Sequence, residues 1–187
     1  MQIFHRLLRL QMRRAKADET KSVLRDCISR VNSIAVVHEF LAQQGSGTVD
    51  MAAVAQGIYK AVLSGMAAPE LRLTTGFSAD NVVIPSEKAT SMALVLNEML
   101  QNCFDHAFTG RTQGAISVEL KKTESGCRLT VCDDGNGLPP GFNGIPQSSL
   151  GLRIIKTMAE ADLHGTFKIE NRPQGGTCAE VAIPLGG

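Results

Sequence analysis

The chain has 187 residues, of which 19 are Lys or Arg and 18 are Asp or Glu, so its formal net charge is +1 at pH 7. With 43% hydrophobic and 20% charged residues, the composition excludes a disordered or low-complexity protein. The balanced charge, no Trp and a single Tyr argue against a nucleic-acid partner, which would require a basic surface and stacking aromatic side chains.

Cysteine usage and hydropathy indicate a cytoplasmic protein. The five cysteines contain no C-x-x-C pair, so we expect neither a disulfide framework nor a zinc site. The longest mostly apolar stretch, residues 33–42, is interrupted by His38 and Glu39 and is too short to span a bilayer. The basic N-terminus is not followed by the apolar segment of a signal peptide. The cysteines are Cys27, Cys103, Cys127, Cys132 and Cys178.

Residues 1–44 contain no Pro and no Gly and are helical in periodicity. A polar turn at 16–20 divides them, so we predict an antiparallel helical hairpin over residues 1–46. A single hairpin leaves its apolar stripes half covered, which favours pairing with a second copy in a four-helix bundle. The stripes comprise Ile3, Leu7 and Leu10 in the first helix and Leu24, Cys27, Val31, Ile34, His38 and Leu41 in the second.

After Gly45-Ser46-Gly47 the composition changes, and residues 47–187 read as a second, catalytic domain. Its pattern predicts an α+β fold with helices on one face of a mixed, mostly antiparallel sheet. It lacks the regular strand–helix alternation of Rossmann and P-loop domains. We expect helices at 49–64, 85–108 and 150–163, strands at 71–77, 81–84, 115–120, 127–132, 166–170 and 177–183, and a loop at 138–148.

The long helix ending at Phe108 carries a row of polar side chains. Glu98, Asn102 and His106 are four residues apart and therefore share one face. A carboxylate, an amide oxygen and an imidazole in one row suit a hydrated Mg²⁺ and the phosphates bound to it. The alternative is a solvated polar face opposite an apolar one.

The strand at 127–132 runs into Asp133-Asp134-Gly135-Asn136-Gly137. A carboxylate at a strand end, beside glycines that allow close approach, can accept a hydrogen bond from an exocyclic amine such as that of adenine. The alternatives are a plain turn or a calcium loop, and the further acidic ligands of an EF-hand are missing.

Two further glycine signals follow. Ser149-Leu150-Gly151-Leu152 opens a helix whose free N–H groups suit a phosphate, to which Arg153 and Lys156 can add positive charge. Gly175-Gly176-Thr177 is a tight turn into the last strand. Each signal alone is weak, but their order after the N-E-x-x-x-N helix is specific.

In these motifs the chain resembles, over residues 47–187, the ATP-binding domain of sensor histidine kinases, which DNA gyrase B, MutL and the heat-shock ATPase chaperones share. The resemblance implies a Bergerat-type fold that uses ATP and Mg²⁺. Asn102 would coordinate the metal, Glu98 would assist the metal or water, and 138–149 would be the lid over the nucleotide. The implied nucleotide contacts are Asn102, Asp105, His106, Asp133, Gly135, Gly137, Leu138, Ser149, Leu150, Gly151, Leu152, Arg153 and Thr177.

Two positions depart from that family's pattern. Many histidine kinases have Lys where this chain has Asp105, so a negative charge replaces one phosphate contact. The lid ends in Ser149-Leu150-Gly151-Leu152 rather than Gly-x-Gly-Leu. The second glycine is kept, so the phosphate site is expected to survive.

The first segment resembles the second HisKA-type dimerisation family, on the residues Leu7–Arg14 and Arg30–Glu39. That family carries its phosphoacceptor in an H-H-R-V-K-N-N-L-Q motif, whose last two positions align with Met1-Gln2. The resemblance therefore implies an acceptor histidine upstream of Met1, with the chain a fragment, a sequence begun too late or a shortened kinase. We expect His5 to be a surface residue and His38 a packed one.

Together these features predict the core of a two-component histidine kinase. It would form a homodimer through the hairpin, transfer the γ-phosphoryl of Mg-ATP to a histidine, and pass it to an Asp of a response regulator receiver domain. Two alternatives stay open: an ATP-binding dimeric regulatory module without phosphotransfer, and an anti-sigma-type serine/threonine kinase. The long hairpin argues against the second.

Overall fold

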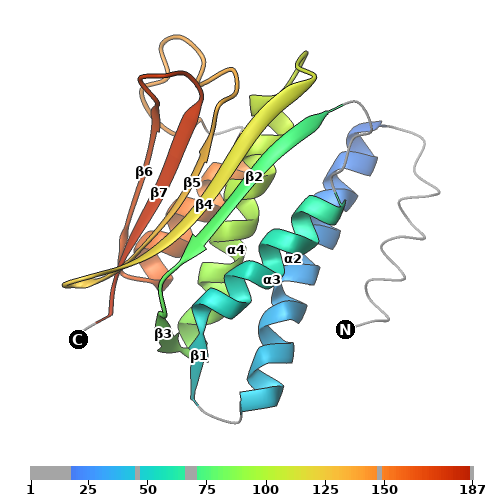
Figure 1. The fold of residues 1–187 in the computed structure, drawn as a ribbon. Helices are drawn as coiled ribbons and strands as arrows, with labels where there is room; N and C mark the ends of the chain where they lie inside the picture. The colour runs from blue at the N-terminus through green and yellow to red at the C-terminus, as the bar shows by residue number, and fades with distance from the viewer. Residues whose placement is uncertain (1–17, 45–46, 66–70, 147–148, 186–187) are drawn as a thin grey trace.

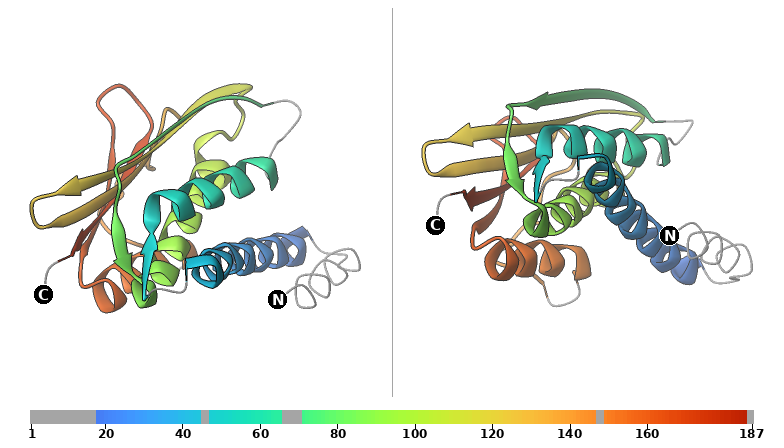
Figure 2. Two further views of the ribbon diagram at one scale, coloured as in Figure 1. Left: turned by 60° about the horizontal axis from the view of Figure 1, so that its bottom comes forward. Right: turned by 90° about the horizontal axis from the view of Figure 1, so that it is seen from below.

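The computed structural model describes residues 18–44, 47–65, 71–146 and 149–185. A five-stranded sheet is covered on one face by helices, and helix α2 (Asp18–Gln44) packs against those helices rather than on the sheet (Figures 1 and 2). The predicted α+β class, with helices on one face of a mostly antiparallel sheet, is confirmed. None of the helices in these ranges is long and apolar enough to cross a membrane.

The sheet has the strand order β2-β4-β5-β7-β6. Strand β2 runs parallel to β4 and the other neighbours are antiparallel. Side chains on β5 alternate, with Leu129 and Val131 buried towards the helices and Arg128 exposed on the open face. The strands are β2 (Arg72–Ala79), β4 (Gln113–Thr123), β5 (Gly126–Asp133), β6 (Thr166–Asn171) and β7 (Thr177–Pro184).

The helices begin close to their predicted positions, and two end differently. The helix predicted for 85–108 is α4 (Ser86–Asn102) continued by a π-helical turn, η1 (Cys103–Ala107). The one predicted for 150–163 is α5 (Leu150–Thr157), likewise continued by a π-helical turn, η2 (Met158–Asp162). Helix α3 (Met51–Gly65) starts later than predicted, because Thr48–Asp50 form a short strand, β1, that pairs with β3 (Val83–Pro85).

Helix α4 is the centre of the molecule. It packs on the sheet and against α2, α3 and α5, so every residue from Val95 to Gln101 is buried. A helix covered on all sides is normally apolar all round. Asn97, Glu98 and Gln101 break that rule, and each therefore requires a polar partner or a ligand.

Helix α2 presents two different faces. The face towards α3 and α4 contains Ser29, Ser33 and Val37, of which Ser33 and Val37 are buried. On the predicted seam, Leu24, Cys27, Val31 and Ile34 are half-buried and His38 is exposed. The expectation that His38 is packed is therefore wrong for a single chain. The first helix of the predicted hairpin, with His5, lies outside the described residues.

A disulfide joins Cys132 to Cys178, contrary to the expectation from cysteine spacing. The ladder of β5 and β7 places these residues directly opposite each other, with Cα atoms 4.2 Å apart. Strand register is set by tertiary pairing and does not show in cysteine spacing. In the described ranges the other cysteines, Cys27, Cys103 and Cys127, are free thiols.

Candidate functional site

An apolar cavity of about 260 Å³ lies between the sheet and the end of α4, and residues from both ends of the predicted lid line it. Its walls are largely hydrocarbon, with few polar side chains, as in a site for a flat heterocycle. The lining includes Met99, Asn102, Cys103, His106, Val131, Asp133, Gly137, Leu138, Phe142, Ser149, Leu152, Ile169, Thr177 and Ala179.

The Asp133 carboxylate lies in this cavity with its two oxygens in different environments. Asp133 is only 3% exposed. Its Oδ1 accepts hydrogen bonds from the backbone N–H groups of Gly135 (2.8 Å) and Thr177 (3.1 Å). Its Oδ2 has one weak donor, the Cys103 thiol at 3.8 Å, so it retains acceptor capacity for an amine. Burial, then the charge of Asp133, raise the pKa of that thiol well above its ordinary value.

Glycine is needed at Gly135 and at Gly137 for different structural reasons. Gly137 lines the apolar cavity with φ +76°, a left-handed conformation that favours glycine. Gly135 lines neither cavity, and a Cβ there would collide with the carbonyl oxygen of Ala107. The structure thus gives Gly135 a packing role against η1, and its approach to a ligand stays a prediction.

A second, polar cavity of about 320 Å³ adjoins the first, and Asn102, His106 and Ser149 line both. The start of α5 forms one side of it, and no side chain caps that helix. The positive end of the helix dipole and its free N–H groups favour an anion here. Its other lining residues are Asp26, Arg30, Glu98, Gln101, Asp105, Leu150 and Gly151.

Most of the predicted contacts thus gather around two adjoining cavities. Glu98, Asp105, Leu150 and Gly151 line the polar one, while Asp133, Gly137, Leu138, Leu152 and Thr177 line the apolar one. Arg153, like Gly135, lines neither. An apolar chamber with one carboxylate oxygen that keeps acceptor capacity, beside a polar chamber at a helix N-terminus, suits a nucleotide, with its base in the first and its phosphates in the second.

The candidate metal ligands are Asn102 and Glu98. A Cβ placed on Gly151 would lie 3.3 Å from both Asn102 Oδ1 and Glu98 Oε2, so the two oxygens flank one small space. Among the described residues no three His, Cys, Asp or Glu side chains form a metal cage. Mg²⁺ commonly uses one or two protein oxygens and takes its other ligands from phosphates and water, so the two oxygens beside Gly151 are a sufficient protein contribution.

Three buried polar atoms near these ligands have no hydrogen-bond partner among the described residues. They are Asn102 Nδ2 and both amide atoms of Gln101. Buried polar atoms are almost always hydrogen-bonded, so atoms without a partner on a cavity wall indicate that a ligand or water completes the site.

Reading the sequence missed three residues of the polar cavity: Asp26, Arg30 and Gln101. Arg30 binds Glu98 through two hydrogen bonds of 2.8 Å. The only sequence feature that could have pointed to Arg30 is the pair Ser29 and Ser33, small polar residues four apart on α2 and on either side of Arg30. Gln101 had a better signal, since it is a polar residue on a helix that is otherwise buried all round.

We expect Asp105→Lys to strengthen ATP binding about tenfold at low salt. Asp105 is one of three carboxylates around the polar cavity, with Asp26 and Glu98. Burial is the largest effect on Asp105 and raises the pKa of its carboxyl, so its charge is costly even before a triphosphate arrives. A lysine there replaces repulsion of the phosphates by attraction. Calorimetric titration with ATP at two salt concentrations measures the change, which should shrink as salt rises.

Glu124→Lys is the matched control, because Glu124 is exposed in the β4–β5 turn and lines neither cavity. It makes the same change in net charge. Equal gains in the two variants would mean that overall charge, and not position 105, determines the affinity.

Comparison with known families identifies the chain. Residues 87–187 match the family described as Histidine kinase-, DNA gyrase B-, and HSP90-like ATPase. Residues 1–66 match a second family, described as Histidine kinase. The chain belongs to the histidine kinase family. The resemblance inferred from the sequence motifs is thereby confirmed, and ATP binding and signal transduction are the properties of this family.

Curated relatives agree with this assignment. The chain is 32% identical over 181 residues to the sensor histidine kinase PdtaS of Mycolicibacterium smegmatis, an alignment covering 96% of this chain and 36% of that protein. PdtaS of Mycobacterium tuberculosis is 31% identical over the same length. Thus the chain spans about a third of the length of these relatives.

Solved structures show the same fold. The histidine kinase domain of the Erythrobacter litoralis EL346 blue-light activated kinase superimposes with a TM-score of 0.76 at 23% identity, covering 97% of this chain and 92% of that one. The catalytic domain of the histidine kinase ThkA superimposes with a TM-score of 0.58 and covers 74% of this chain. The first superposition spans almost the whole chain and the second about three-quarters of it.

Proposed function

We propose that this chain is the kinase core of a two-component sensor, which binds Mg-ATP and transfers the γ-phosphoryl to a histidine of a dimerisation hairpin. A response regulator Asp then receives the phosphoryl group. The observation that carries the proposal is the pair of adjoining cavities, with Asp133 Oδ2, which has only the weak Cys103 thiol as donor, in one and the uncapped start of α5 in the other. The proposal includes a dimer formed through residues 1–46, domains divided near residue 46 and a cytoplasmic location.

Each residue has a defined part in this activity. Asp133 orients the adenine through its free oxygen, and the N–H groups at Gly151 and Leu152 bind phosphate. Asn102 and Glu98 would hold Mg²⁺, which neutralises phosphate charge when it is bound. The hydrocarbon walls exclude water from the base. Catalysis then rests on positioning and charge neutralisation, as in other phosphoryl transfers.

The test is incubation of the chain with Mg²⁺ and γ-labelled ATP, alongside a chimera that carries the H-H-R-V-K-N-N segment ahead of Met1. We expect both proteins to bind ATP and the chimera to gain a label that is lost in acid and kept in base, as phosphohistidine is. Replacing the first or second histidine of the added segment by Gln should identify the acceptor.

A second candidate, an ATP-binding regulatory module without phosphotransfer, is favoured by Asp105 in the polar cavity. ATP binding with no label on the chimera would support this module and contradict the kinase. No ATP binding at all would contradict both. The family match over residues 1–66 argues against the anti-sigma-type alternative.

A further inference from the structure

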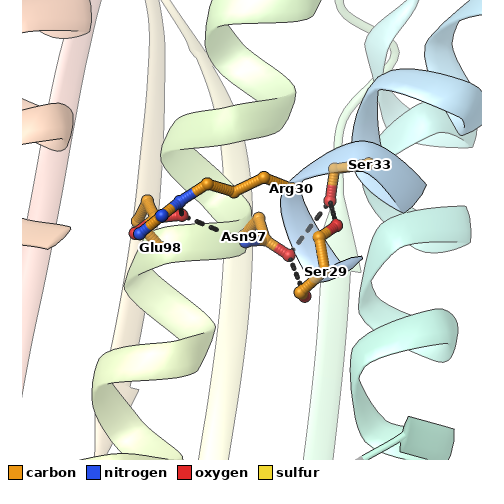
Figure 3. A network of polar contacts seen from close by, with 5 residues as sticks. All are labelled: Ser29, Arg30, Ser33, Asn97 and Glu98. Atoms are coloured by element: carbon orange, nitrogen blue, oxygen red, sulfur yellow. Dashed lines mark hydrogen bonds and ion pairs between the residues drawn. The ribbon is translucent and has the colours of Figure 1, made fainter. Parts of the chain in front are cut away.

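An ion pair between α2 and α4 closes one side of the polar cavity. Arg30 Nε lies 2.8 Å from Glu98 Oε1, and Arg30 Nη2 lies 2.8 Å from Glu98 Oε2 (Figure 3). The side chains are 21% and 3% exposed, respectively. A planar guanidinium that binds both oxygens of a carboxylate is the strongest geometry for such a pair.

Neighbouring side chains hold Glu98 in place and tie it to α2. Asn97 Nδ2 donates to Glu98 Oε1 at 3.2 Å. Asn97 Oδ1 in turn accepts from Ser29 (2.7 Å) and Ser33 (3.0 Å), which lie on either side of Arg30 on α2 (Figure 3). The network joins α2 to α4 through polar contacts, where helix-to-helix contacts are normally apolar.

The ion pair also occupies Glu98, one of the two proposed metal ligands. Both Glu98 oxygens are engaged by Arg30, while the proposed partner ligand, Asn102 Oδ1, flanks the same space beside Gly151. Glu98 is nearly fully buried, and a buried carboxylate without a counterion is strongly unfavourable. Arg30 can therefore leave Glu98 only when another cation takes its place.

The same cavity provides Arg30 with an alternative partner. Arg30 lines it together with Gly151 at the start of α5, where the phosphates are proposed to bind. A guanidinium has five N–H donors in a fork that matches phosphate as well as carboxylate. The buried atoms without partners, on Gln101 and Asn102, lie on the wall of this cavity.

We propose that Arg30 exchanges partners on nucleotide binding. Without ATP it is the counterion of Glu98, and with Mg-ATP the metal takes Glu98 while Arg30 binds the terminal phosphate. The inference rests on the proposed function and adds a residue of the hairpin segment to the ATP site. Helix α2 thereby distinguishes ATP from ADP, which lacks that phosphate.

The test is a double-mutant cycle in which one change removes the Arg30 side chain and the other removes the terminal phosphate of the nucleotide. Dissociation constants of Mg-ATP and Mg-ADP are measured for the intact chain and for Arg30→Gln. We expect the variant to lose about tenfold more affinity for ATP than for ADP, since a charge-assisted bond to phosphate is lost only with ATP. A purely structural Arg30 would weaken both nucleotides equally, and that result would overturn the proposal.

Arg128→Gln is the matched control. Arg128 also pairs with a glutamate, Glu180 at 3.5 Å, but on the exposed face of the sheet and outside both cavities. Its ratio of ATP to ADP affinity should equal that of the unmodified chain. If Arg30→Gln does not fold, Arg30→Lys keeps a positive charge beside Glu98. Its ratio of ATP to ADP affinity then tests the proposal in the same way, and we expect that ratio to fall about threefold.

A second readout needs no nucleotide. If Arg30 and a metal compete for Glu98, Arg30→Gln should bind Mn²⁺ alone at least about fivefold more tightly than the unmodified chain, as measured by electron paramagnetic resonance titration. Unchanged Mn²⁺ affinity would contradict the exchange. Failure of the unmodified chain to bind ATP would instead overturn the proposed function, so the two failures are distinguishable.

Discussion

Asp133→Asn is expected to weaken ATP binding about 100-fold while leaving the fold intact. The asparagine Oδ1 can keep the two backbone N–H bonds from Gly135 and Thr177 that Asp133 Oδ1 accepts. Its NH₂ group would replace Oδ2, the oxygen with free acceptor capacity in the apolar cavity. A donor would then face the amine of adenine, and a charge-assisted hydrogen bond of about 2–3 kcal/mol would be lost. Calorimetric titration measures the affinity.

Guanine nucleotides provide the specificity control. Guanine presents a carbonyl oxygen where adenine presents its amine, so the asparagine NH₂ can donate to it. We therefore expect GTP affinity to fall less than ATP affinity, or to rise. A parallel fall for both nucleotides, together with a lower midpoint of thermal unfolding, would show that Asp133 supports the fold and not adenine recognition.

Gly176→Ala is expected to lower the free energy of unfolding by more than about 3 kcal/mol. Gly176 has φ +84°, and a Cβ there would collide with the carbonyl oxygen and carbon of Asp133. Both atoms are backbone, so no side chain can move aside. That carbonyl also accepts a 2.8 Å hydrogen bond from Arg172. The variant therefore carries backbone strain, a steric overlap and a lost hydrogen bond together. Urea unfolding measures the loss.

The neighbouring glycine separates these causes. Gly175 has φ +97°, but a Cβ there would meet nothing within 4 Å. Gly175→Ala should therefore cost only the left-handed conformation, about 1–2 kcal/mol. Equal losses at the two positions would mean that contact with Asp133 does not matter. ATP affinity should fall only in the Gly176 variant, since only that substitution displaces the Asp133 backbone.

Local patterns predicted the parts of the site that belong to one element. The spacing of Glu98, Asn102 and His106 placed all three on the wall of one cavity, even though the helix changes to a π-helical turn after Asn102. The glycines around Asp133 and Thr177 correctly marked the ends of β5 and the start of β7. Helical period and turn chemistry act over a few residues, so they are readable without a fold.

Contacts between segments far apart in the chain could not be predicted from the sequence. Arg30 and Glu98 are 68 residues apart, and only the packing of α2 on α4 brings them together. Cys132 and Cys178 are 46 residues apart and meet through strand register. Gly135 follows the same rule, since its constraint is the backbone of Ala107 in η1. Each depends on tertiary geometry, which periodicity does not encode.

The end of the β5–β7 ladder has a consequence for how this chain can change in evolution. The Thr177 N–H to Asp133 hydrogen bond and the Cys132–Cys178 disulfide close the base of the segment between these strands. The predicted lid begins within this segment at Leu138, whose N–H donates to Asn171 Oδ1 at 2.7 Å. Because both ends of the segment between β5 and β7 are fixed, doubling the length of the predicted lid would lower the free energy of unfolding by only about 0.6 kcal/mol through loop-closure entropy. Insertions can therefore accumulate there without moving the Asp133 carboxylate.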